Sequence, residues 1–97
     1  MESESASIFE FIRSELARKA DICANALEEA RKLSERSVYG PSLNQLVARA
    51  FELLDDIDEI LVALDPARDQ HQFAIAAELH RQLERLEAAI ASQRRTG

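Results

Sequence analysis

The sequence is poor in the residues that break helices or crosslink chains. Two glycines and two prolines among 97 residues leave little material for a β-rich fold with many turns. The single Cys23 excludes an intrachain disulfide and a cysteine-rich zinc site. Hydrophobic residues make up 46% of the chain and charged residues 31%, a composition typical of soluble helical proteins. We therefore predict an all-α fold.

Long apolar runs and an excess of basic residues are also missing. No stretch approaches the ~18 apolar residues of a membrane span, and the acidic N-terminus lacks the basic flank of a signal peptide. A net charge of −6 disfavours nucleic acid, because phosphate binding needs a basic face. We expect a cytoplasmic protein with no membrane and no nucleic-acid partner, and one unpaired cysteine agrees with a reducing compartment.

Start and stop signals divide the chain into three helices. Ser7 to Glu10 and Ser42 to Gln45 fit capping boxes, in which a hydroxyl and a Glu or Gln side chain satisfy free amides of the first turn. Tyr39-Gly40-Pro41 predicts a break between them. At Asp65-Pro66, Asp65 is a candidate N-cap and Pro66 suits the first helical position. We predict one domain over residues 1–97, with helices at about 7–37, 42–64 and 66–94 and frayed ends at 1–6 and 95–97.

Apolar residues follow a heptad-like period in each predicted helix, as in a coiled coil. The rows are Phe9, Ile12, Leu16, Ala20, Cys23, Leu27 and Ala30 in the first; Leu43, Val47, Ala50, Leu54, Ile57, Leu61 and Leu64 in the second; Ala76, Leu79, Leu83, Leu86 and Ile90 in the third. These rows predict a three-helix bundle in which the long first helix packs on an antiparallel hairpin of the other two. Counting outward from Asp65-Pro66 places Ile57 near Ile75 and Ala76. At ~1.5 Å per residue the first helix is longer than the second, so one of its ends projects or it bends.

The first helix carries apolar residues beyond its main row. Ile8, Phe11, Ile22 and Leu33 lie along one edge and widen the apolar arc to about half of the circumference. We call these four residues the apolar edge. They either wrap the rim of the core or bury against a partner, and we favour a partner because large apolar patches on soluble monomers usually mark contacts. Symmetry favours a two-fold homodimer.

Basic residues are absent from positions 50 to 66, although this segment holds six acids. Four of them lie on the side of the second helix away from its apolar row, and we call them the acidic strip: Glu52, Asp55, Asp56 and Glu59. Like charges three and four residues apart repel, by a few tenths of a kcal/mol each. The strip is either a solvated outer face or a docking surface for a basic partner.

Patterns that carry catalysis or bind cofactors are missing, and we predict no enzyme, no cofactor, no metal and no small-molecule substrate. His71 and His80 are nine residues apart and point in opposite directions on one helix, so they cannot share a metal ion. Cys23 lies in an apolar row, where a small core residue is the expected role. His80 is expected to hydrogen bond to Glu84, one turn away.

One exposed histidine on a helical bundle of this size resembles the plan of histidine phosphotransfer domains. That resemblance implies a signalling carrier that uses His80. Those domains typically carry Lys-Gly three residues after the histidine, whereas this chain has Leu83 and Glu84 there. A carboxylate at that place repels a phosphoryl group, so the carrier is our alternative.

In size, acidity and helical hairpin architecture the chain resembles the small chaperones and adaptors of bacterial secretion systems, which shield apolar helices of a client. The resemblance implies a protein–protein interaction module. The apolar edge would take an apolar helix of the partner, and the acidic strip would attract its basic flank. A purely structural homodimer without a client is the third hypothesis.

Overall fold

A computed structural model describes the backbone of residues 2–96 and the side chains of residues 8–93. It contains three helices, α1 (Glu2–Glu35), α2 (Pro41–Leu61) and α3 (Gln70–Thr96), and no strand within the described backbone. The predicted all-α fold of three helices is confirmed.

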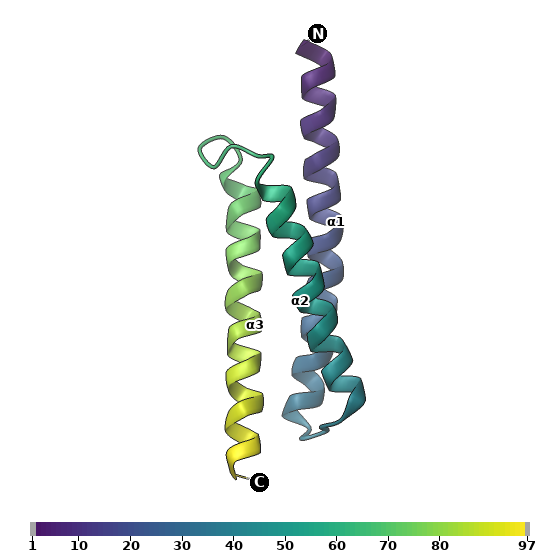
Figure 1. The fold of residues 1–97 in the computed structure, drawn as a ribbon, viewed down its shortest axis with the longest axis vertical. Helices are drawn as coiled ribbons and strands as arrows, with labels where there is room; N and C mark the ends of the chain where they lie inside the picture. The colour runs from purple at the N-terminus through teal and green to yellow at the C-terminus, as the bar shows by residue number, and fades with distance from the viewer. Residues whose placement is uncertain (1, 97) are drawn as a thin grey trace.

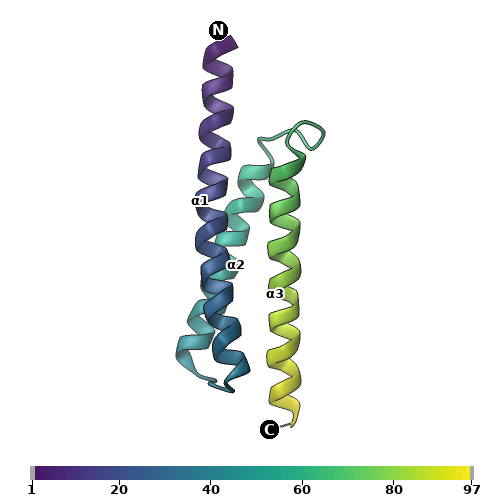
Figure 2. The ribbon, with the colours of Figure 1, turned by 180° about the vertical axis from the view of Figure 1, so that it is seen from behind.

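The three helices lie side by side in an up-and-down order (Figure 1). α1 and α3 run in the same direction, and α2 runs antiparallel to both. α1 packs against α2 and α3, and its contact with α2 is the most extensive of the three. The N-terminal end of α1 projects beyond the α2–α3 connection, as both views show, and the Cα atoms extend over 59 × 22 × 16 Å (Figure 2). Of the two outcomes predicted for the long first helix, projection is the one found.

The core lies along the predicted apolar rows. Leu16, Cys23, Leu43 and Ile57 are the largest fully buried side chains. The remaining buried members of the three rows join them in one cluster, and Phe9, Ile12, Val47, Leu61 and Ile90 pack on it while partly exposed. The 3.6-residue period therefore identified the inward face of each helix.

α1 ends in a reversal at Ser37. The Val38 amide donates to the Leu33 carbonyl at 2.9 Å and the Ser37 amide to the Ser34 carbonyl at 3.0 Å, which is the Schellman pattern. Ser37 has a φ of 59°, in the left-handed region where glycine is favoured. The predicted break at residues 39–41 is present, but Gly40 is the N-cap, with a φ of 154°, and Pro41 begins α2. Ser42 therefore lies inside the helix, and the predicted capping box there is wrong.

Replacing Ser37 by glycine is expected to stabilise the protein by roughly 0.5–1 kcal/mol. The left-handed conformation costs a residue with a Cβ atom ~1–2 kcal/mol, and the greater chain entropy of glycine in the unfolded state offsets part of that gain. Thermal unfolding monitored by circular dichroism measures the effect. Ser14→Gly, at an exposed position inside α1, is the matched control and should destabilise by about 0.5 kcal/mol.

The connection between α2 and α3 is longer than predicted. α2 ends at Leu61, where the Ala63 and Leu64 amides bond to carbonyls three residues back, and α3 begins only at Gln70. Asp65 does not cap a helix that begins at Pro66. The Asp65 carbonyl instead accepts the Arg68 and Asp69 amides in a separate turn. The Asp69 carbonyl accepts the Gln72 and Phe73 amides in the first turn of α3. The connection of residues 62–69 is nearly centred on Asp65-Pro66, and the register counted from that point stays a prediction.

α1 begins before its predicted start. It runs from Glu2, so Ser7 lies within the helix and cannot cap it. The helices extend into both segments for which fraying was predicted, because α1 includes residues 2–6 and α3 includes residues 95 and 96. Residues 1 and 97 lie outside the described part of the chain.

Candidate functional site

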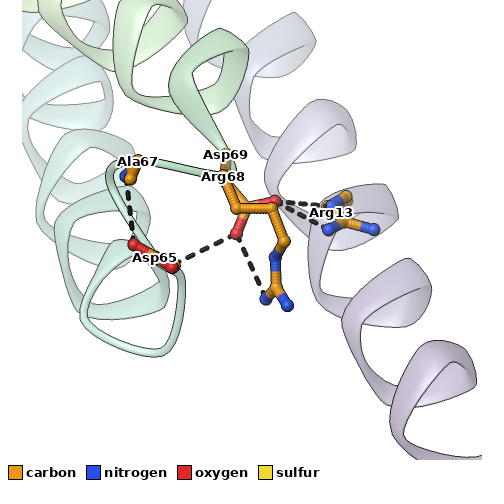
Figure 3. Close-up of polar contacts among 5 residues, drawn as sticks. All are labelled: Arg13, Asp65, Ala67, Arg68 and Asp69. Atoms are coloured by element: carbon orange, nitrogen blue, oxygen red, sulfur yellow. Dashed lines mark hydrogen bonds and ion pairs between the residues drawn. The ribbon is translucent and has the colours of Figure 1, made fainter. Parts of the chain in front are cut away.

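A buried carboxylate joins the α2–α3 connection to α1 (Figure 3). The Arg13 Nε and Nη2 atoms both donate to Asp69 Oδ1, at 2.9 and 2.7 Å. The other oxygen, Oδ2, accepts the Asp65 amide at 3.1 Å and lies 3.6 Å from Arg68 Nη2. The Asp69 side chain is 2% exposed. We call Arg13, Asp65, Arg68 and Asp69 the clasp.

The electrostatics of the clasp favour the ionised carboxylate. Burial alone would raise the pKa of Asp69. The hydrogen bonds from Arg13 and the Asp65 amide, with the charges of Arg13 and Arg68, outweigh burial and lower the pKa below its ordinary value. Asp69 therefore stays charged and bound to Arg13 at neutral pH.

Arg68 extends the clasp to the side of α1. Its guanidinium carbon lies 4.3 Å from the centroid of the Phe9 ring, in cation–π geometry. Asp69 and Arg68 of the connection thus contact α1 at Arg13 and Phe9, respectively. The sequence prediction missed the clasp, since Arg13 and Asp69 are 56 positions apart. The only local signal was a second N-cap candidate, Asp69, four residues after Asp65.

A groove of about 400 Å³ runs between α1 and α2 beside the clasp. Its apolar lining comes from Phe11 and Ile12 of α1, Ile60 of α2 and Ala63, which follows the end of α2. The charged lining residues are Glu15, Lys19, Asp56 and Glu59, so acids outnumber bases three to one. We call this the α1/α2 groove.

The structure separates the four residues of the predicted apolar edge. Ile8 and Phe11 are 59% and 66% exposed, and Ile22 is 36% exposed. Leu33 packs against the core and is only partly exposed. Phe11 alone of the four lines the α1/α2 groove. Sequence reasoning did not single out Val62 on the α2–α3 connection, the most exposed large hydrophobic residue at 86%.

The acidic strip lies on an exposed face of α2, and two of its residues line the same groove as Phe11. Asp56 pairs with Lys19 of α1 at 3.0 Å, and Glu52 lies 3.9 Å from Arg49. Within residues 8–93, no cation lies within 4.0 Å of Asp55 or Glu59. Nearby cations therefore offset part of the repulsion at Glu52 and Asp56, but not at Asp55 and Glu59.

His80 makes a different contact from the one predicted. Its Nε2 lies 3.1 and 3.2 Å from the two carboxylate oxygens of Asp58, across the α2–α3 packing, rather than bonding to Glu84. The contact between positions 58 and 80 depends on the rotation of α2 against α3, which no pattern within a single helix specifies. His80 is thus held by a carboxylate.

Cys23 is fully buried, and burial raises the pKa of its thiol. Its Sγ lies 3.7 Å from the Ala50 carbonyl oxygen, to which it can donate a weak hydrogen bond. Cys23 therefore packs as a small core residue, as predicted.

Residues 8–93 contain no group of three or more His, Cys, Asp or Glu side chains arranged to hold a metal ion. No helix in the described part of the chain combines the length and the apolar character that a membrane crossing requires. In comparisons with protein-family models, curated proteins and solved structures, the chain matches none of them.

Proposed function

We propose that this protein is a non-enzymatic interaction module that binds an amphipathic helix of another protein in the α1/α2 groove. An adaptor or a chaperone that shields a client helix would act in this way. The proposal rests on one observation: Phe11, Asp56 and Glu59 line the same groove. An exposed aromatic residue in a groove that acids also line is what a basic amphipathic helix would contact.

The shape of the groove suits a helix. α1 and α2 form its two walls, and the lining residues on α1, at positions 11, 12, 15 and 19, recur at helical spacing. A third helix lying between them would set its apolar face on Phe11 and Ile60. Phe11 offers the largest exposed apolar surface of the lining residues, so we expect it to supply much of the binding energy.

Charge favours a basic partner over a second copy in this groove. Glu15 and Asp56 have cation partners, with Arg18 and Lys19, but Glu59 has none within 4.0 Å among residues 8–93. The first twelve residues of the chain contain Glu2, Glu4 and Glu10 and no Lys or Arg. Two copies that paired through their Phe11 regions would therefore bring acids together, which opposes association.

The signalling carrier that would use His80 has less support. A phosphoryl group on His80 Nε2 would lie beside the Asp58 carboxylate, now 3.1 Å away, and the two anions would repel each other. Neither Leu83 nor Glu84 could stabilise the added charge.

Binding of a designed peptide tests the proposal. The probe is an amphipathic helical peptide with leucine along one face and lysine on both flanks, and we measure its affinity by isothermal titration calorimetry. Phe11→Ser and Glu59→Lys are each expected to weaken binding by roughly tenfold or more, because the first removes an aromatic anchor and the second reverses a charge at the rim. Affinity should also fall as salt is added.

Two control variants separate groove binding from simple charge attraction. Val38→Ser removes an exposed apolar residue that does not line the groove, and Glu84→Lys makes the same charge change on α3. Both should bind the peptide as the unaltered protein does. Equal losses in Glu59→Lys and Glu84→Lys, or no loss in Phe11→Ser, would contradict the proposal.

A further inference from the structure

A second groove lies between α1 and α3. It consists of two hollows in series, of about 420 and 530 Å³, and Glu78 lines both. α1 lines them from Ala17 to Glu35, a length of roughly 27 Å at ~1.5 Å per residue. The two helices that border the groove, α1 and α3, run in the same direction (Figure 2). We call it the α1/α3 groove.

Each of the two helices presents an acid followed by an arginine along this groove. On α1, Asp21 precedes Arg31, and Glu28 and Glu35 also line the groove; on α3, Glu78 precedes Arg85. The midpoint of each pair is position 26 on α1 and a position between 81 and 82 on α3. One hollow is lined by residues 17–24 of α1 and 71–79 of α3, and the other by residues 27–35 and 78–89. A residue of α3 therefore lies at about the height of the α1 residue whose number is about 54 lower. The two midpoints therefore lie at nearly one height along the bundle.

We propose that a second copy of this chain covers the α1/α3 groove, antiparallel to the first, about a two-fold axis at that height. α1 of one copy then lies on α1 of the other, and α3 on α3. Glu78 of each copy faces Arg85 of the other, and Asp21 faces Arg31. A two-fold interface must be complementary to itself, and this order of charges meets that requirement.

Each proposed contact joins a residue that already has an ion-pair partner to one that has none. Arg31 pairs with Glu28 and Glu35, and Glu78 pairs with Arg81. Within residues 8–93, Asp21 and Arg85 have no opposite charge within 4.0 Å. Ala17, Ala24 and Ala74 are exposed in the groove, and such short side chains allow helices to approach to the usual 8–10 Å between axes. The acids and bases of the α1/α2 groove do not alternate in this way. This proposal concerns another face and is independent of the proposed function.

Charge reversal tests the arrangement. Light scattering of the unaltered protein should give twice the 10.9 kDa mass of the chain. Arg85→Glu places acids opposite Glu78 at both symmetry-related contacts, and Glu78→Arg places arginines opposite Arg85. Each single change is expected to weaken the dimer at least about tenfold, and the double variant Glu78→Arg/Arg85→Glu should restore it, because the pairs re-form with their signs exchanged.

Further variants locate the interface. Glu84 and Phe11 do not line the α1/α3 groove. Glu84→Arg and Phe11→Ser should therefore both leave the dimer intact. All substituted positions are exposed, and far-UV circular dichroism verifies that each variant is folded. A monomeric unaltered protein, a dimer that both single reversals leave unchanged, a double variant that stays monomeric, or dissociation by Phe11→Ser would each overturn the proposal.

Discussion

Replacing Asp69 by alanine is expected to lower the melting temperature by on the order of 10 °C. The change removes the acceptor of two hydrogen bonds from Arg13 and leaves the Asp65 amide, which donates to Asp69 Oδ2, without its partner. Removing the buried partner of an ion pair costs more than removing an exposed charge, because the partly buried Arg13 loses its acceptor. Differential scanning calorimetry measures the effect.

Asp55→Ala is the matched control for this prediction. Asp55 is an exposed acid with no cation within 4.0 Å among residues 8–93, so its loss should change the melting temperature little. Equal melting temperatures for the Asp69 and Asp55 variants would show that the clasp contributes nothing to stability.

A second test of the clasp compares how the stability of the unaltered protein and of the variant Asp69→Asn depends on pH. The folded-state pKa of Asp69 lies below its ordinary value of 3.8, so the stabilisation is present above about pH 4 and is lost as the pH falls through the lowered pKa. The unaltered protein should therefore lose stability more steeply in acid than the Asn variant does. Arg18 and Arg31 also lower the pKa of Glu15 and Glu28, respectively. Both pairs are present in both proteins, so their contributions to stability cancel when the two proteins are compared.

Replacing Ile57 by alanine is expected to destabilise the protein by about 2–5 kcal/mol. Ile57 is fully buried at the centre of the core, and the change removes apolar contacts and leaves a cavity. For a chain of 97 residues this corresponds to a fall in melting temperature of roughly 10–30 °C. Urea unfolding gives the free energy directly, and the slope of the transition should not change.

Val62→Ala is the control for the core substitution. Val62 is 86% exposed, so its truncation should change stability by no more than about 0.5 kcal/mol. The reverse order of effects would contradict the burial of Ile57 and the exposure of Val62.

The fold could be predicted to the extent that it depends on periodicity. Leu16, Leu43 and Leu83 lie in rows that the 3.6-residue period defines, and all three are buried. The ends of the helices depend on competing local hydrogen bonds, and there the prediction failed. Asp65 and Asp69 are both plausible N-caps, and Asp69, the residue before α3, bonds to Arg13, which is 56 positions away.

Single residues of the candidate sites could be predicted from the sequence, but their proximity in the fold could not. Phe11 and Glu59 were each identified from a pattern along one helix. That they line the same groove depends on the rotation of α1 against α2, which no pattern within a single helix specifies. The Lys19–Asp56 pair and the contact of His80 with Asp58 were missed for the same reason.

The distance along the chain between Arg13 and Asp69 has a consequence for the order of folding. Five residues connect α1 to α2, whereas the clasp closes a segment of 56 residues. Loop-closure entropy makes the longer closure costlier by about 2 kcal/mol. The α1–α2 hairpin should therefore form before α3 docks, with the clasp absent from the transition state. Asp69→Ala would then accelerate unfolding and leave the folding rate almost unchanged.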